Sequence, residues 1–225
     1  MRWFITALVL CVGSIIFGAP VKSMIGAYGI SSVNEESGIV EVEYLESTGT
    51  QYILVNSQID GFDGWLLPGN NNTYGAVGIW NGGARADTIK WTNVQNRGWC
   101  FLTGHNNNNV YTYDMTYDFT HVIVDGQLCY VNGNHYQIGA VWGTYFSEYH
   151  YFALFGSYHR DGYVNIQSCK IGICKLYYKG ELLYDFTPIR YKNEDNRWEG
   201  AMYNNVTGEL FRNQGTGEFI FGRDI

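Results

Sequence analysis

Short runs in which hydrophobic and polar residues alternate dominate the chain from Ile39 onward. Val40-Glu-Val-Glu-Tyr-Leu45 alternates strictly, and comparable runs recur as far as Phe221. A period of two is typical of half-buried β-strands, whereas no stretch after Ile39 shows the period of a helix. The pattern therefore predicts an all-β domain.

Turn residues separate these runs and place the predicted strands. Asp125-Gly126, Asn132-Gly133, Gly180 between Lys179 and Glu181, and the segment 204–208 each join two runs as hairpins. We expect strands at residues 40–45, 51–55, 74–80, 88–91, 98–102, 110–113, 120–124, 127–131, 136–139, 151–155, 163–168, 174–178, 182–187, 201–203, 209–211 and 218–221. Residues 60–64 and 68–73 are predicted loops on either side of the short apolar segment Trp65-Leu-Leu67.

Without helices, strands of this number pack as two antiparallel sheets, and at this length a jelly-roll sandwich is the most economical arrangement. Residues 39–225 are expected to form that one domain. Residues 28–38 are expected to be a linker. Residues 1–27 contain the apolar run from Trp3 to Ala19 after Arg2, which predicts a cleavable signal peptide or an uncleaved membrane anchor, with the signal peptide favoured.

Composition excludes some classes of protein. The chain is 17% aromatic, with 28 Gly and 3 Pro, which is unlike a disordered protein. Its formal net charge is -7, and its 14 Lys and Arg residues are dispersed, which argues against nucleic-acid binding. Contact with a membrane is expected only through the N-terminal segment.

Two terminal motifs carry a resemblance to a known family. Glu41-Val-Glu-Tyr-Leu-Glu-Ser-Thr-Gly-Thr-Gln-Tyr-Ile53 opens the domain. Cys174-Lys-Leu-Tyr-Tyr-Lys-Gly, Leu183-Tyr-Asp-Phe-Thr-Pro188, Gly200-Ala-Met-Tyr, Val206-Thr-Gly and Phe211-Arg-Asn-Gln-Gly-Thr-Gly-Glu-Phe219 close it. These segments resemble the ends of concanavalin A-like, laminin G-like modules, which occur in surface proteins of gut bacteria and in phage structural proteins. The resemblance implies a jelly roll whose first and last strands are neighbours and a role in binding or assembly.

The loop from Arg190 to Trp198 departs from that pattern. It is longer than the usual connection of the group and more charged, with Lys192, Glu194, Asp195 and Arg197. It marks a feature particular to this protein.

Four cysteines, Cys100, Cys129, Cys169 and Cys174, lie in the predicted domain. An even number in an exported protein allows disulfides, with three possible connectivities. Small buried hydrophobes on strands are an equal alternative.

Two sets of polar residues suggest chemistry. Asp60 and Asp63, followed by Asn70 to Asn72, gather oxygen ligands that suit calcium, although the same residue types are common in turns. Glycoside hydrolysis requires two carboxyl groups on rigid elements, and no strand carries the expected acidic pattern. We therefore assign no catalytic residue.

Aromatic residues near strand ends are the candidate ligand contacts: Trp80, Trp91, Trp99, Trp142 and Tyr145, with Asn106 as a hydrogen-bonding group. Most aromatics in a sandwich belong to the core, so only one or two of these are expected to touch a ligand.

The sequence thus predicts a non-catalytic, secreted or cell-surface module that recognises carbohydrate or a protein partner, with self-association left open. A structural component of a virion and a glycan-active hydrolase are the alternatives.

Overall fold

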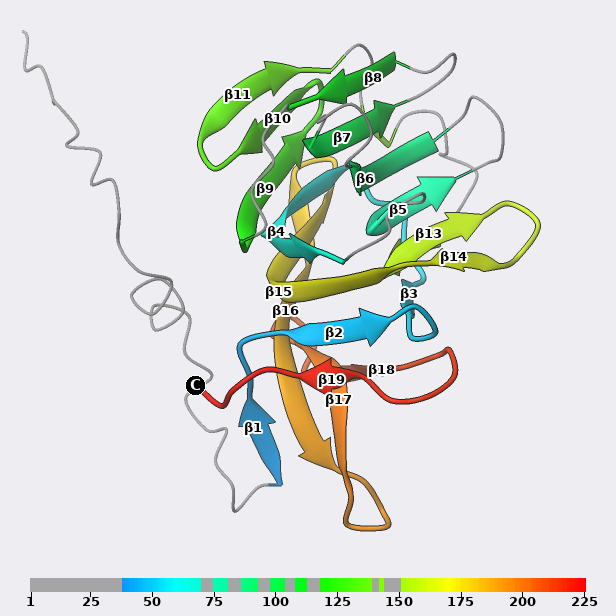
Figure 1. Ribbon diagram of the computed structural model, residues 1–225, viewed down its shortest axis with the longest axis vertical. Helices are drawn as coiled ribbons and strands as arrows, with labels where there is room; N and C mark the ends of the chain where they lie inside the picture. Colours follow the sequence, from blue (N-terminus) through cyan, green and yellow to red (C-terminus); the bar gives the residue numbers. More distant parts are fainter. Residues whose placement is uncertain are drawn as a thin grey trace, which may run out of the picture. The chain divides into compact units, whose positions relative to one another are not determined.

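The computed structural model of the chain describes residues 38–69, 75–80, 86–92, 98–103, 108–112, 118–138, 142–143 and 151–225 (Figure 1). All of these residues belong to one compact unit, Val33–Ile225. The predicted signal peptide or anchor at residues 1–27 lies outside them. None of the described segments forms a helix that is long and apolar enough to span a membrane.

Eleven of the described strands form the larger sheet. Its main path runs β11-β10-β9-β4-β15-β16-β17-β18, while β1 pairs with β16, and β2 pairs with both β15 and β19. The bounds are β1 Ile39–Glu41, β2 Leu45–Thr48, β4 Gly61–Pro68, β9 Thr120–Asp125, β10 Leu128–Val131, β11 Asn134–Gln137, β15 Ser168–Tyr178, β16 Glu181–Lys192, β17 Trp198–Asn204, β18 Glu209–Arg212 and β19 Ile220–Phe221.

The smaller sheet contains eight described strands. Its main path runs β14-β13-β5-β6-β7-β8, and β12 pairs with both β3 and β5. The bounds are β3 Ile53–Val55, β5 Val77–Trp80, β6 Ala86–Thr92, β7 Gly98–Thr103, β8 Asn108–Tyr111, β12 Phe152–Leu154, β13 Gly156–His159 and β14 Val164–Ile166. Among the described pairings, β5 with β13 is parallel and the others are antiparallel.

One hydrophobic core lies between the two sheets. Phe62 of β4, Val122 of β9 and Leu176 of β15 belong to the same cluster of buried residues as Ile89 of β6 and Phe101 of β7. Residues between these positions on each strand point to the outer faces, as a period of two requires. The structure therefore confirms an all-β sandwich of two sheets.

The beginning and the end of the domain are neighbours, as expected, and Figure 1 shows β19 beside β2. Ile220 of β19 lies opposite Glu46 of β2, and Val42 forms a bridge with Asp224. The predicted strand 40–45 is interrupted at residues 43–44, where the main chain bonds instead to residues 222–223. The expected hairpins are present, and Asn132-Gly133 and Lys179-Gly180 both have the positive φ angles of tight two-residue turns.

The predicted loop at residues 60–64 is wrong, because residues 61–64 are the first half of β4 in the middle of the larger sheet. Its glycines permit close packing between strands. A Cβ atom on Gly64 would lie 2.5 Å from Cys174 Cβ and 2.8 Å from Phe62 Cζ. Glycine at these positions thus reflects a crowded strand, which a turn-based interpretation misses.

The crowding at Gly64 gives a direct test. We expect Gly64→Ala to lower the free energy of unfolding by about 1–3 kcal/mol, because the added methyl group must displace both Cys174 and the Phe62 ring from a packed core. Gly61→Ala is the matched control on the same strand. Its Cβ would meet Tyr177 Cβ at 3.1 Å, which a small shift relieves. Urea denaturation measures both variants, and equal midpoints for the two would refute the packing argument.

Candidate functional site

A hollow of about 300 Å³ opens on the outer face of the larger sheet above Gly61. Gly61 lies between Asp125 of β9 and Tyr177 of β15 in the strand register. Because glycine has no side chain, a gap lies between the outward-facing side chains of Asp125 and Tyr177. The lining residues are Asp60, Gly61, Phe62, Asp63, Ile123, Val124, Asp125, Tyr177 and Gly180. Phe62 and Val124 contribute through their main chain, since their side chains face the core.

Asp60 holds one end of the hollow in place. Both of its carboxylate oxygens accept a hydrogen bond from the main-chain N–H of Lys179, at 3.0 and 2.9 Å. Its own N–H donates to the carbonyl of Tyr177 at 2.9 Å. Gly143 packs against it, since a Cβ there would lie 2.6 Å from Asp60 Cα. The hairpin turn between β15 and β16 is thereby fixed beside the hollow.

Asp63 is oriented by an aromatic pair. Its Oδ1 lies 2.6 Å from Nε2 of His121 on the neighbouring strand β9. The His121 ring stacks on Trp65, with centroids 4.9 Å apart and planes 16° from parallel. Both members of the Asp63–His121 pair remain about one third exposed. An oriented carboxylate with an aromatic pair beside it suits hydrogen bonding to a ligand.

Sequence reasoning found Asp60 and Asp63 but not the rest of this site. Tyr177 and Asp125 are separated from them by more than fifty residues in the chain and meet them only through the order of the strands. Among the described residues, no three His, Cys, Asp or Glu side chains are arranged to hold a metal ion. Asn70 to Asn72 lie outside the described residues, so calcium binding stays a prediction.

Three of the predicted ligand contacts belong to the core instead. Trp91, Trp99 and Trp142 are at most 2% exposed, and all three are members of the main hydrophobic cluster. Trp142 packs edge-on against Phe152. The prediction that they contact a ligand at the surface is therefore wrong for this structure, because their strand positions point inward. Trp80 is half-buried, and Tyr145 and Asn106 lie outside the described residues.

Of the two alternatives for the cysteines, the structure shows buried free thiols at Cys100, Cys129, Cys169 and Cys174 and none of the possible disulfides. Cys169 and Cys174 are five positions apart on β15, about 16 Å along an extended strand, whereas a disulfide requires Cα atoms within about 7 Å. Cys129 is three strands away from β15, on β10. Cys100 lies on β7 between Trp99 and Phe101, which face the core, so its side chain points to the opposite face.

Burial makes these thiols poor nucleophiles. Loss of hydration raises the pKa of Cys129 to about 12, and it also raises the pKa values of Cys169 and Cys174. The Cys129 thiol donates a weak hydrogen bond to the carbonyl of Tyr136 at 3.6 Å. Cys129, Cys169 and Cys174 therefore act as small core residues.

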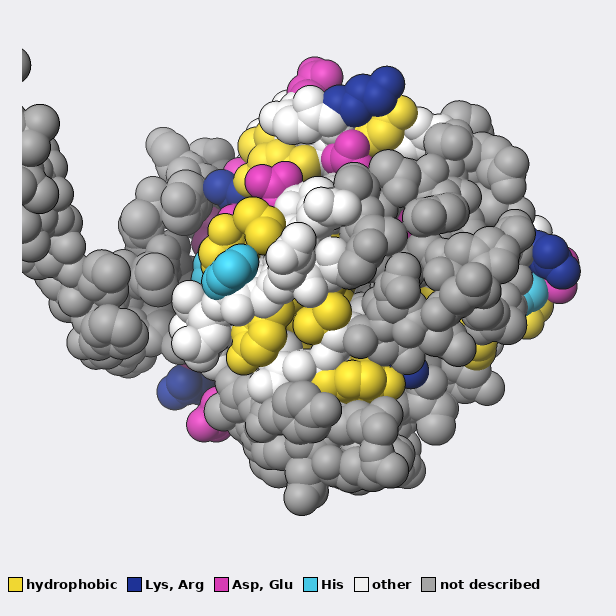
Figure 2. Space-filling view, turned by 90° about the horizontal axis from the view of Figure 1, so that it is seen from above, with side chains coloured by type: hydrophobic (Ala, Val, Ile, Leu, Met, Phe, Trp, Pro, Cys, Tyr) yellow, Lys and Arg dark blue, Asp and Glu magenta, His cyan; other side chains and the backbone are white. Residues whose placement is uncertain are grey.

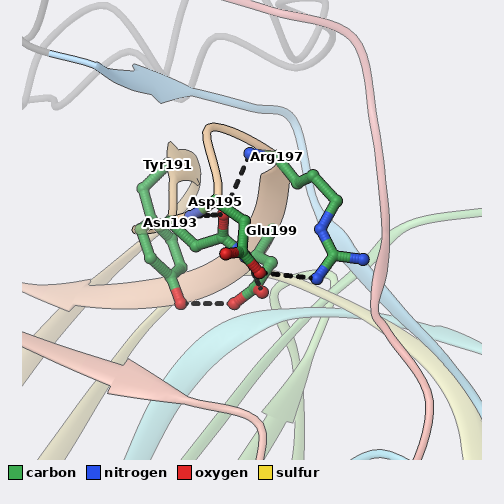
Figure 3. A network of polar contacts seen from close by, with 5 residues as sticks. All are labelled: Tyr191, Asn193, Asp195, Arg197 and Glu199. Carbon is green, nitrogen blue, oxygen red and sulfur yellow. Dashed lines mark hydrogen bonds and ion pairs between the residues drawn. The ribbon is translucent and has the colours of Figure 1, made fainter.

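The charged loop between β16 and β17 pairs its charges within itself (Figure 3). Tyr191 Oη donates to Glu199 Oε2 at 2.6 Å, and Asn193 Nδ2 donates to Glu199 Oε1 at 2.6 Å. Arg197 bonds to Asp195 at 2.9 Å. The hydrogen bond from Tyr191 is the main reason that the pKa of Glu199 lies below its ordinary value. Burial raises the pKa of Tyr191 to about 12, and the bond to Glu199 adds to this shift.

A second set of contacts ties this hairpin to the C-terminus. The Arg190 guanidinium donates two 2.8 Å hydrogen bonds to Asp224 and lies 3.9 Å from the centre of the Trp198 ring. These residues stabilise the meeting of the two ends of the domain. The hairpin that contains the charged loop thus contributes contacts that stabilise the fold.

Comparisons of the chain with models of protein families, with curated proteins and with solved structures gave no match. Membership of the concanavalin A-like group therefore stays a prediction from the terminal motifs.

The thiol assignment predicts the result of alkylation. In native protein at pH 8, iodoacetamide should leave Cys100, Cys129, Cys169 and Cys174 unmodified, because the thiols are buried and the pKa shifts keep Cys129, Cys169 and Cys174 protonated. In guanidinium chloride without reductant all four should react. Peptide mass spectrometry measures both states. Peptides joined by a disulfide under non-reducing conditions would contradict the assignment.

The hairpin network predicts a change in pKa and in alkaline stability. Tyr191→Phe should raise the pKa of Glu199 toward its ordinary value, as measured by NMR titration of the carboxyl carbon, whereas Tyr203→Phe should not. Because the folded-state pKa of Tyr191 is above the unfolded value of about 10, the wild type should lose stability as pH rises through about 12. Tyr191→Phe should lose less stability over the same pH range. If the stability of the two proteins depends on pH in the same way, the proposed network is wrong.

Proposed function

We propose that this protein is a non-catalytic carbohydrate-binding module whose ligand occupies the hollow above Gly61. The supporting observation is the combination of shape and chemistry at that point. Carboxylates of Asp60, Asp63 and Asp125 surround a cavity of about 300 Å³ that also has the Tyr177 and Ile123 side chains in its lining. Sugars present hydroxyl groups beside apolar C–H faces, and such a lining can satisfy both.

The carboxylates are placed to act as hydrogen-bond acceptors. Asp60 already accepts from a main-chain N–H, and Asp63 is held by His121. A ligand rich in hydroxyl groups can donate hydrogen bonds to the remaining lone pairs of these two carboxylates. On the face seen in Figure 2, described acidic side chains lie among hydrophobic and uncharged ones, and most of the basic side chains lie beside acidic ones. Neutral or weakly charged polyols are therefore favoured over polyanions.

Binding is favoured over hydrolysis for a chemical reason. A glycosidase needs a general acid that presents a proton to the leaving oxygen and a second carboxylate on the opposite side of the bond. Asp60 and Asp63 are both occupied as acceptors within the protein. Hydrolysis is nevertheless the natural second activity of a hollow with three carboxylates, so it is measured directly in the test below.

The apolar N-terminal segment and the resemblance of the domain ends support the wider context of this proposal. The module acts outside the cell or at its surface, as a concanavalin A-like domain does. The alternative role, a structural component of a virion on the same fold, predicts no affinity for free saccharides.

Isothermal titration with a panel of neutral and acidic oligosaccharides tests the function. We expect at least one oligosaccharide to bind. Asp63→Asn and Tyr177→Ala should each lower its affinity about 10-fold to 100-fold, since a hydrogen bond to a charged group contributes about 1.5–3 kcal/mol. Asp195→Asn is the matched control, because that carboxylate lies exposed in the β16–β17 loop and pairs with Arg197.

Chromatography of the same mixtures detects cleavage. If the wild type releases shorter saccharides and Asp63→Asn does not, the function is hydrolysis and the proposal of a non-catalytic module is wrong. If neither Asp63→Asn nor Tyr177→Ala changes the affinity for the saccharide, the hollow above Gly61 is not the binding site.

A further inference from the structure

A row of outward-facing side chains leads away from the hollow above Gly61 across the larger sheet. Asp63 of β4 lies opposite Ile123 of β9, which lies opposite Tyr130 of β10. Tyr130 in turn lies opposite His135 of β11. Residues that face each other on paired strands share one face of the sheet, and Figure 1 shows β9, β10 and β11 side by side. Asp63 and Ile123 line the hollow, so Tyr130 lies directly beyond its edge.

A second row runs beside the first. Asp125 lines the hollow on β9 and lies opposite Leu128 of β10, which is 36% exposed. A single exposed apolar side chain is ordinary on a protein surface. Leu128, however, shares its face of β10 with Tyr130, because Cys129 between them belongs to the core. Apolar and aromatic surface therefore adjoins the hollow on its β10 side.

The rings of Tyr130 and His135 lie together at the far end of the first row. Their centroids are 5.8 Å apart, and their planes are 40° from parallel. Tyr130 is half-buried and His135 is exposed. We call these two side chains the ring pair. Such rings can pack against the C–H face of a sugar while their polar atoms form hydrogen bonds with its hydroxyl groups.

The other side of the hollow has a different character. The hairpin turn between β15 and β16 bounds it there, because Asp60 accepts hydrogen bonds from the main-chain N–H of Lys179 and Gly180 belongs to the lining. Farther along the sheet, Lys175 and Asp185 lie opposite each other on β15 and β16 and carry opposite charges. A neutral ligand longer than the hollow therefore finds suitable surface on the β10 side.

We infer that the ligand is a saccharide chain of at least two units, which extends from the hollow above Gly61 to the ring pair. Neighbouring strands lie about 4.8 Å apart, so the row from Asp63 to His135 spans about 14 Å. A single sugar ring is shorter than this row. One unit occupies the hollow, and another unit along the chain stacks on the ring pair. The inference rests on the proposed function, and it makes Tyr130 and His135 the residues that select for chain length.

Isothermal titration of the full chain with a monosaccharide and with its di-, tri- and tetrasaccharide tests the inference. The wild type should bind the tetrasaccharide at least 10-fold more tightly than the monosaccharide. Tyr130→Ala should lower the affinity for the tetrasaccharide at least 10-fold and leave that for the monosaccharide unchanged, because the single unit stays in the hollow. Tyr203→Ala is the matched control, since Tyr203 is a half-buried tyrosine on β17, away from both rows.

A second variant guards against a folding defect in Tyr130→Ala. His135 is exposed, so His135→Ala should keep the melting temperature of the wild type. It should still lower the affinity for the tetrasaccharide, by at least 3-fold, because it removes half of the ring pair. The affinity for the monosaccharide should again be unchanged.

The outcomes separate this inference from the function on which it rests. If Asp63→Asn weakens binding but neither Tyr130→Ala nor His135→Ala changes the preference for chain length, the hollow remains the site and the extension is wrong. If no saccharide of any length binds, both proposals are wrong. If the ring-pair variants abolish binding and Asp63→Asn has no effect, the ligand does not enter the hollow, and the inference is again overturned.

Discussion

The burial of a single apolar core between two sheets is the constraint on which the rest of this structure depends. Each fully buried Val, Leu, Ile or Phe side chain contributes about 1.5–3 kcal/mol through its removal from water, and the cluster draws such residues from both sheets. On a strand, burial of one residue commits its neighbours to the opposite face. The core therefore decides which side chains are left for binding.

The tryptophans and cysteines show this effect most clearly. Trp91 and Trp99 lie opposite each other on β6 and β7 and fill the core, where they serve packing. The thiols on β10 and β15 are held apart by the strand order and stay reduced. The remaining polar side chains lie on the outer faces, where Gly61 leaves a gap between Asp125 and Tyr177.

The architecture could be predicted from the sequence because it follows from local signals. Alternation in Thr120 to Val124 and the Asn132-Gly133 turn each specify their own strand or hairpin without reference to distant residues. The same kind of local signal predicted a loop from Asp60 to Gly64, where the structure has the first half of β4. Its Asp and Gly residues are typical of turns, yet Gly64 is required because Cys174 lies directly opposite it on β15. Contacts between strands far apart in the chain are not visible in local patterns.

The candidate sites were only partly predictable for the same reason. Asp60 and Asp63 could be identified as a pair because they are close in sequence, whereas Tyr177 and His121 join them through strand order. Trp80 could be selected as an aromatic near a strand end.

We propose above all that hydroxyl-rich ligands bind on an outer face of the sandwich, above Gly61. Titration of the ¹⁵N-labelled full chain with oligosaccharides, followed by amide chemical shifts, tests it most directly. If a ligand binds there, we expect the shift changes to be concentrated at Gly61, Asp63, Ile123, Asp125 and Tyr177, with the hairpin from Tyr191 to Glu199 unaffected. Spectra that do not change with any saccharide, or changes confined to that hairpin, would contradict it.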